Sequence, residues 1–351
     1  MKKNIIALAI ASVVAAPVAM AGAPTIYGQV SMAVDNYDMT NADGTTNKIK
    51  SGTQINSRTS KFGIKGSEDL GEGLTAVYKF EFEVQIDEAT TLKNRNQYVG
   101  VAGGFGTVLL GRHDTPLKMA QGTDLFNYSP VADIKKMADG LGVLKVGGEL
   151  RSSNVLAYVS PSFSGVTLVG AFIPKETAAN NTVAAKNSSL TDVTSFALMY
   201  GSKKEGLYLS GAINSFSSAY VDANLGADLS ANEMRLVAQY STGGLVANVM
   251  YQDFGGKALE NSDQEGTTIG GAVAYKVGKF TPKLQVMQID RTKDTAGVKF
   301  EDSFNYALGL DYSLGKKTTV FAEYATIENQ GGAANTKAET TALSVGLTHK
   351  F

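Results

Sequence analysis

Charged side chains recur at every second position in residues 74–87, whose sequence is Leu-Thr-Ala-Val-Tyr-Lys-Phe-Glu-Phe-Glu-Val-Gln-Ile-Asp. Lys79, Glu81, Glu83 and Asp87 share one set of alternate positions, and large apolar residues fill most of the other. Because successive side chains of a β-strand point to opposite faces, the segment predicts a long strand with a charged face and an apolar face. Fixed charges beside water can select ions by their sign. A strand on a soluble core can show the same pattern, so the rest of the chain must decide.

Residues suited to catalysis are scarce. The chain has two histidines, His113 and His349, far apart in sequence, and no cysteine or tryptophan. It contains no P-loop, no G-x-S-x-G motif and no His/Cys set with the spacing of metal ligands. We therefore predict no catalytic residue, no metal site and no cofactor. The alternative is a hydrolase that uses His113 as its base, which would need a Ser or Asp partner brought close by the fold.

The N-terminus has the three parts of a secretory signal peptide. Lys2 and Lys3 are followed by an apolar stretch, 5–18, and by the cleavage motif Ala-Met-Ala at 19–21. This predicts a signal peptide over 1–21 and a mature chain over 22–351. No apolar run reaches the roughly 18 residues that a membrane-spanning helix needs. Removing Lys2 and Lys3 leaves 30 basic side chains against 33 acidic ones, a net charge near −3 that argues against a nucleic-acid partner.

The alternation of the first strand recurs as far as the C-terminus. In 304–312 and 343–351, large apolar residues alternate with small or polar ones. A dry core would fill the second set with Val, Ile and Leu, so this face is predicted to be wet. A membrane-spanning strand needs about 9–11 residues with lipid on one side and water on the other. The pattern therefore predicts an all-β protein, a transmembrane antiparallel β-barrel formed by the single domain 22–351.

Turn signals give the number of strands. Short turns are predicted at seven places, and longer polar loops lie between them; the turns are 69–73, 103–106, 161–165, 203–206, 242–244, 277–279 and 315–317. Short turns at one end and long loops at the other are typical of outer-membrane barrels. If both termini lie at the short-turn end, seven turns join eight hairpins, which makes sixteen strands. The same parity places Lys79 and Arg235 inside and predicts outward aromatic residues: Tyr78, Phe80, Phe82, Tyr240, Tyr275, Phe304, Tyr306, Tyr312 and Tyr324.

One connection, 113–151, has no convincing alternation. Ser129 followed by Pro130 predicts the start of a helix that continues to Asp139 and ends at Gly140. Connections of this length are usually functional or unstructured. We predict a loop folded into the barrel lumen, with an ordinary surface loop as the alternative.

With strands, turns and this loop in place, the chain resembles the general diffusion porins of Gram-negative outer membranes, most closely the neisserial and beta-proteobacterial type. Four stretches carry the resemblance: 57–74 (SRTSKFGIKGSEDLGEGL), 94–101 (NRNQYVGV) with 104–112 (GFGTVLLGR), 151–161 (RSSNVLAYVSP), and the last strand ending at Phe351. The resemblance implies a sixteen-stranded barrel, usually a homotrimer, surrounded by outer-membrane lipids and lipopolysaccharide. It also implies a third long loop that narrows a water-filled pore for passive diffusion of ions and small hydrophilic solutes.

The resemblance also implies which charges line the constriction. Basic wall residues carried over by motif are Lys61, Arg95 and Arg151, and the acidic loop position is Asp124. The enteric Pro-Glu-Phe-Gly-Gly loop sequence is missing, so Asp133 is the candidate for the second loop carboxylate. Strand parity adds Lys79, Glu81 and Glu83 as lumen charges, and Arg112, which ends a strand, completes the candidates. Each of them could instead be a solvated lumen charge away from the neck.

Two other functions remain as alternatives. A substrate-specific outer-membrane channel would line its neck with aromatic residues, for which the candidates are Tyr27, Tyr128 and Tyr208. A barrel enzyme in the outer membrane would depend on His113, because His349 falls on the outward face of the last strand beside Phe351. The porin function explains more of the chain than either.

Overall fold

The computed structural model describes residues 23–41, 45–47, 51–89, 92–138, 150–174, 188–221, 228–259, 262–293, 302–330 and 337–351. The predicted signal peptide, 1–21, and part of the predicted loop, 139–149, lie outside the described residues. The elements in chain order are β1 (Thr25–Thr40), β2 (Gly52–Ser57), β3 (Lys61–Gly71), β4 (Leu74–Val84), β5 (Leu92–Gly103), β6 (Gly106–Asp114), α2 (Pro116–Ala120), α3 (Ile134–Met137), β7 (Arg151–Val159), β8 (Val166–Ile173), β9 (Val193–Gly201), β10 (Gly206–Val221), β11 (Asp228–Thr242), β12 (Leu245–Leu259), β13 (Ser262–Tyr275), β14 (Phe280–Lys293), β15 (Ser303–Ser313), β16 (Thr318–Gln330) and β17 (Lys337–Lys350).

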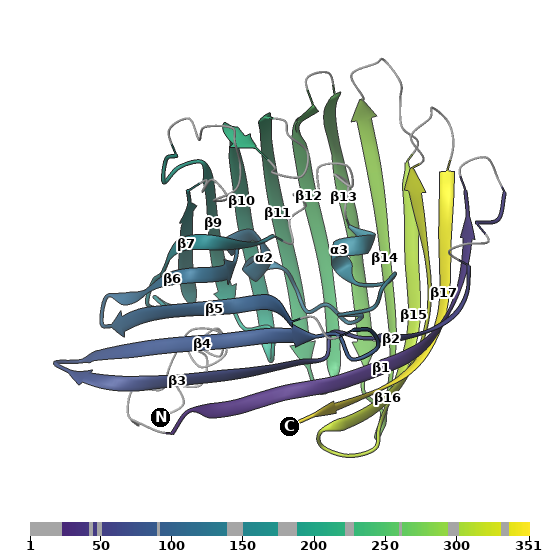
Figure 1. Cartoon of the computed structure of the whole chain (residues 1–351), viewed down its shortest axis with the longest axis horizontal. Helices are drawn as coiled ribbons and strands as arrows, with labels where there is room; N and C mark the ends of the chain where they lie inside the picture. The colour runs from purple at the N-terminus through teal and green to yellow at the C-terminus, as the bar shows by residue number, and fades with distance from the viewer. Residues whose placement is uncertain are drawn as a thin grey trace.

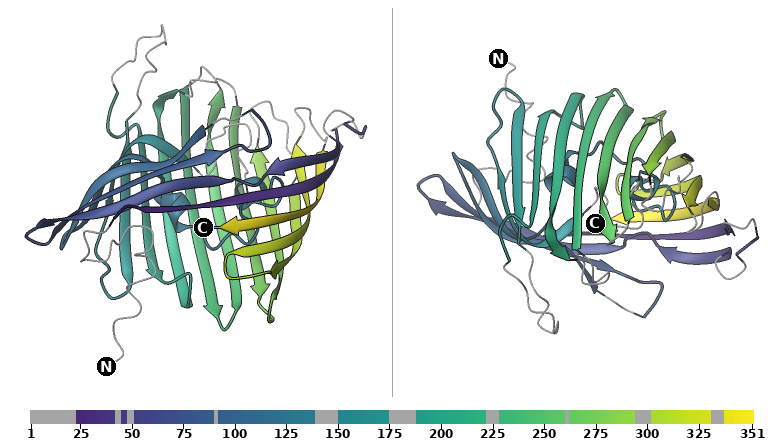
Figure 2. Two further views of the ribbon diagram at one scale, coloured as in Figure 1. Left: turned by 60° about the horizontal axis from the view of Figure 1, so that its bottom comes forward. Right: turned by 90° about the horizontal axis from the view of Figure 1, so that it is seen from above.

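The strands form one closed antiparallel sheet (Figures 1 and 2). Each strand pairs with its neighbour in sequence, and β1 closes the cylinder by pairing with β17. β2 and β3 both pair with β1 and are two parts of a single strand, interrupted at 58–60. The barrel therefore has sixteen strands, which confirms the predicted fold. Closure leaves no unpaired edge, so backbone N–H and C=O groups are bonded within the sheet.

The chain ends meet at the closure. The amide of Phe351 donates to the carbonyl of Gly28, 3.1 Å away. A Cβ atom at Gly28 would lie 2.4 Å from the Phe351 ring, so only glycine allows this close approach. The terminal phenylalanine noted in the sequence is therefore packed onto the first strand.

The two faces of the sheet differ as the alternation predicts. Large apolar residues are exposed on the outside, among them Phe80, Tyr240, Tyr275, Phe304 and Tyr324. The other aromatic residues predicted to face outward pack beside neighbours on that surface: Phe82 on Phe62, Tyr306 on Phe304 and Tyr324, Tyr312 on Phe280, and Tyr78 beside Gly66. The opposite face carries polar side chains, for example Asp35, Arg235, Gln285, Asn305 and Ser344. An apolar exterior around a polar interior is the arrangement expected of a barrel in a membrane.

Helices play a small part in the fold. None of those in the described residues is long and apolar enough to cross a membrane. Both α2 and α3 belong to the connection between β6 and β7, and they lie within the cylinder (Figure 1).

Candidate functional site

Residues 115–138 of the connection between β6 and β7 lie against the inner face of one half of the barrel and are called the inner loop below. The carbonyl of Ala120, at the end of α2, accepts hydrogen bonds from the Tyr208 hydroxyl (2.9 Å) and the Ser210 hydroxyl (2.6 Å) of β10. Beside α3, the amide of Asn305 on β15 donates to the Met137 carbonyl (2.8 Å). Neutral wall groups thus satisfy backbone groups that folding has removed from water.

Apolar packing adds to this attachment. Leu117, Phe126 and Met137 of the inner loop are fully buried and belong to one cluster with wall residues such as Met250 and Met287. The lumen is therefore dry locally, under the inner loop. The loop is held by both packing and hydrogen bonds on this side of the barrel.

The predicted helix is shorter than the sequence indicated. It begins at Ile134, with Asp133 as its N-cap, whereas Ser129 accepts a hydrogen bond from the Ala132 amide in the preceding turn. Asp133 caps the helix, because its carboxylate accepts hydrogen bonds from the amides of both Lys135 and Tyr128. The boundary therefore depends on contacts within the folded loop.

Asp124 and Asp133, the two predicted loop carboxylates, both bind loop amides. Asp124 accepts from the amides of Phe126 (3.0 Å) and Ile134 (3.0 Å) through its two oxygens. Asp133 accepts from the amide of Tyr128 at 2.9 Å. The two carboxylates brace the loop fold, while Asp124 also lines the cavities on either side of it.

The opposite wall carries the predicted basic and acidic residues in close contact. Arg95 on β5 donates from Nε to Glu81 Oε1 (2.7 Å) and from Nη1 to Glu83 Oε2 (3.1 Å). Lys79 Nζ lies 3.4 Å from Glu81 Oε2, and Lys61 projects from β3 on the same face. The structure brings these five residues together, and we call them the charged wall. Alternate positions on neighbouring strands place their side chains on one surface.

Tyr128 connects the inner loop to the charged wall. Lys61 Nζ donates to the Tyr128 hydroxyl at 2.7 Å and lies 4.8 Å from the ring centroid. The Arg95 guanidinium lies 5.6 Å from the same centroid. Arg58 Nη1 donates to the main-chain carbonyl of Tyr128 at 3.3 Å. Two basic side chains of the charged wall and Arg58 thus converge on one loop residue.

Three β-bulges aim these side chains. Residues 58–60 oppose only 30–31 of β1, so strand parity changes and both Arg58 and Lys61 face the lumen. Arg95 and Asn96 together oppose Glu81, and both are buried on the lumen side. The third bulge places 153–154 opposite Arg112. Bulges commonly re-aim side chains at functional sites.

Arg151 lies beyond the charged wall, in a neighbouring polar group. Its Nε lies 2.9 Å from Asp114 Oδ1 and donates to Asn96 Oδ1 at 2.7 Å. Lys118 of α2 also lies near Asp114, at 3.4 Å. The group links the start of the inner loop to β5 and β7, which fixes where the loop enters the lumen.

Arg112 departs from its predicted place. It pairs with Gln97 on the face that carries Leu110 and Val99, which is the outer face. Its guanidinium donates to the Asn94 carbonyl (3.2 Å) and the Ser153 hydroxyl (2.8 Å). An outward arginine costs only about 0–1 kcal/mol near the membrane interface, and this one lies two residues before the strand ends. Arg112 therefore belongs to the outer surface and not to the pore wall.

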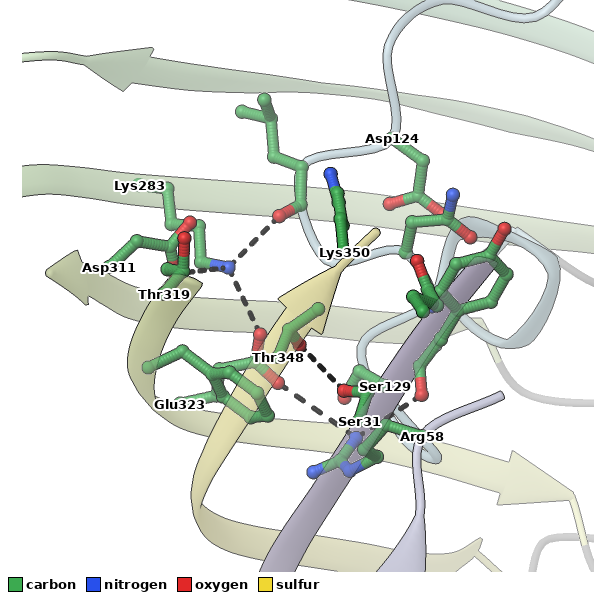
Figure 3. A pocket seen from close by; sticks show the side chains of 15 residues that line it. Ser31, Arg58, Asp124, Ser129, Lys283, Asp311, Thr319, Glu323, Thr348 and Lys350 are labelled. Carbon is green, nitrogen blue, oxygen red and sulfur yellow. Dashed lines mark hydrogen bonds and ion pairs between the residues drawn. The ribbon is translucent and has the colours of Figure 1, made fainter. Parts of the chain in front are cut away.

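A second charged group escaped the sequence analysis (Figure 3). Arg58 Nη2 lies 2.5 Å from Asp35 Oδ1 and Arg58 Nη1 lies 3.9 Å from Glu323 Oε2. Lys283 lies 3.0 Å from Glu323 Oε1 and 2.9 Å from Asp311 Oδ1, and it donates to the Leu125 carbonyl of the inner loop. Asp35 and Asp311 occupy the polar set of alternate positions in their strands, and this pattern could have placed both in the lumen. The bulge hid the orientation of Arg58.

Two cavities lie beside the inner loop. The smaller, of about 290 Å³, is lined by Arg58, Lys283, Asp311 and Glu323 of the second charged group and by parts of β1 and β14–β17. The larger, of about 590 Å³, is lined by parts of β4–β7, β9 and β10 and by Lys203 and Lys204. Among the described residues that line the larger cavity, six are basic and four are acidic. Water in the larger cavity therefore meets a surplus of positive side chains.

A sheet cylinder with an apolar exterior, a charged interior and a loop across its lumen has the architecture of a membrane channel. Sequence comparison leads to the same class. Residues 7–332 match the family described as Gram-negative porin. The major outer membrane protein P.IB is 29% identical in Neisseria lactamica and 30% identical in Neisseria meningitidis serogroup A, each over 359 residues and 100% of both chains. The chain belongs to the Gram-negative porin family.

Solved structures agree on the fold. An anion-selective porin from Comamonas acidovorans aligns with a TM-score of 0.71 and 20% identity, covering 94% of this chain and 99% of that one. Salmonella typhi OmpF, in complex with daunomycin, gives 0.66 and 14%, covering 93% and 97%. Together with the family match, the architecture identifies an outer-membrane porin. The protein forms a water-filled channel for passive diffusion of ions and small hydrophilic solutes.

Proposed function

We propose that this porin selects solutes between the inner loop and the charged wall and that it favours anions. The observation that carries this proposal is the surplus of basic side chains around the larger cavity. Its carboxylates are already engaged: Glu83 with Arg95, Asp114 with Arg151 and Lys118, and Asp124 and Asp133 with loop amides. A net positive lining concentrates anions and repels cations. The Comamonas porin is anion-selective, which agrees with this proposal.

A planar bilayer in a salt gradient tests the preference. The wild-type reversal potential should have the sign of anion selectivity. Lys135→Gln combined with Lys204→Gln should reduce it, because both lysines line the larger cavity and both are exposed. Lys316→Gln, in the turn between β15 and β16, is the matched control and should leave it unchanged. A cation-selective wild type would overturn the proposal.

The residues that we assign to the constriction are Lys61, Lys79, Arg95, Glu81 and Glu83. On this one wall, positive and negative side chains lie side by side, so a polar solute that passes can orient against them. Arg151, Asp124 and Asp133 influence the constriction indirectly, because they position the inner loop. Substitution of Arg95 should therefore alter selectivity more than substitution of Arg151.

We also propose that the signal peptide is removed after Ala21 and that the mature chain is a homotrimer among outer-membrane lipids and lipopolysaccharide. The family supports the trimer, and the cleavage motif at 19–21 supports removal of the signal peptide. Mass spectrometry of the mature N-terminus should find Gly22, and native mass spectrometry should find three chains. A monomer that conducts singly would contradict the trimer.

We infer a channel function without catalysis, and the family supports this inference. His113, the residue on which a hydrolase would depend, is buried with its Nδ1 beside the Asp114 carbonyl (2.8 Å). His113→Ala should leave conductance intact. A hydrolytic activity that disappears in this variant would support an enzyme.

A further inference from the structure

The inner loop spans the lumen from one wall to the other. One side is fixed to β9–β15, where the Ala120 and Met137 carbonyls accept bonds from wall side chains. At its far side, Tyr128 meets Lys61 and Arg95 of the charged wall. Tyr128 is therefore the loop residue whose side chain contacts Lys61 and Arg95.

Tyr128 is held in an unusual backbone conformation. Its φ of 73° lies in the left-handed region, which is uncommon for a bulky residue. Both of its main-chain polar groups are bonded, the amide to Asp133 (2.9 Å) and the carbonyl to Arg58 (3.3 Å). Backbone strain of this kind persists where the surroundings determine it and is common at functional sites. The ring is thus aimed at the wall by contacts at both ends of the residue.

The two cavities meet at this residue. Asp124, Asn127 and Tyr128 line both the smaller and the larger cavity, whereas the wall residues that line them come from different strands. Asp124 is turned toward loop amides. The Tyr128 ring, with Lys61 and Arg95 against it, fills the space between the loop and the wall.

We propose that Tyr128 is the size-determining residue of the channel: its ring bridges the inner loop and the charged wall and separates the two cavities. This inference rests on the proposed selection at that wall. Without the ring, the two cavities join and the free cross-section increases. Lys61 and Arg95 also lose a covering aromatic face and become more accessible to passing anions.

Single-channel conductance and exclusion of polyethylene glycols of graded size test the proposal. Tyr128→Ala should increase conductance and admit larger polymers than the wild type. Tyr128→Phe keeps the ring and should retain the wild-type size limit. Asn127→Ala is the matched control and should retain the wild-type size limit. Asn127 lines both cavities but has no bond to the charged wall among the described contacts.

A reversible variant separates lost bulk from misfolding. The chain has no cysteine, so Tyr128→Cys provides a unique thiol. This variant should conduct more than wild type, and coupling of a benzyl methanethiosulfonate to the thiol should restore the lower conductance and the smaller size limit. A conducting Tyr128→Ala channel with the wild-type size limit would overturn the role of Tyr128 alone. Failure of the wild type to show selection in a salt gradient would instead overturn the proposed function.

Discussion

The two sides of the lumen hold the inner loop in different ways. On the β9–β15 side, amides, hydroxyls and the Lys283 ammonium group bind loop carbonyls, and apolar residues such as Leu117 and Met137 pack without water. On the charged wall, contact is made by Lys61 and Arg95 through Tyr128. Buried apolar packing fixes a position strongly, whereas charges beside water act on passing solutes. The β9–β15 side therefore fixes the loop, and the charged wall acts on the solutes that pass.

The largest expected effect is on the packed side. Leu117→Ala should cost about 2–5 kcal/mol of loop attachment, because a fully buried leucine leaves a cavity. The loop should then be cleaved more readily by proteases, and the open channel should become noisier. Leu125→Ala, at a half-buried position on the same loop, is the milder control. Equal effects of the two variants would contradict a difference in anchoring.

A change on the filtering side should affect selectivity first. Arg95→Gln removes one positive charge and leaves Glu81 and Glu83 without their arginine, so the reversal potential should move toward cation preference. Arg112→Gln, one strand away on the outer face, should have no such effect. The pair compares the same substitution inside and outside the barrel. If Arg112→Gln shifted selectivity as much as Arg95→Gln, the assignment of the two faces would be wrong.

Substitution of Asp124 tests whether this carboxylate stabilises the loop fold or acts on passing ions. Asp124→Asn keeps one carbonyl acceptor for two amides, so we expect a loss of about 0.5–1.5 kcal/mol in loop stability. Thermal unfolding and channel noise should report this loss, with only a small change in ion preference. A large drop in cation permeability with unchanged stability would show instead that Asp124 acts as a pore charge.

The smallest expected effect is a dependence on pH at Tyr128. Burial by itself would raise the pKa of the Tyr128 hydroxyl, but the charges of Lys61 and Arg95 outweigh it and lower the pKa overall. The hydroxyl should therefore begin to ionise below the ordinary tyrosine value of about 10. Each ionised ring adds negative charge opposite the wall, so anion preference should fall as pH rises through this range. Tyr128→Phe should remove that part of the pH dependence.

Much of the architecture could be predicted from the sequence. Alternation gave the apolar exterior and the polar interior, and seven turns gave sixteen strands, because each spanning strand must satisfy lipid and water on opposite faces. Resemblance to porins added Lys61 and Arg95, which the structure places together with Glu81 and Glu83. These features are local in sequence or recur along it.

The parts that could not be predicted depend on irregularities in pairing. Parity continues only while each residue has one partner, and a single extra residue at 58–60 reverses it. For this reason the sequence pattern did not show that Arg58 faces the lumen. Arg112 was placed with the pore charges although its strand parity agrees with its outward position.

By itself, the sequence determined a membrane barrel with a charged lumen, because alternation of side chains is a property of each strand. Only the tertiary structure decided that Asp124 and Asp133 brace the inner loop, that Arg58 joins Asp35 and Glu323, and that Tyr128 bridges loop and wall. The contacts of Arg58 and Tyr128 join segments far apart in the chain, whereas those of Asp124 and Asp133 form within the folded loop. Their geometry follows from closure of the cylinder and from bulges that no local pattern encodes.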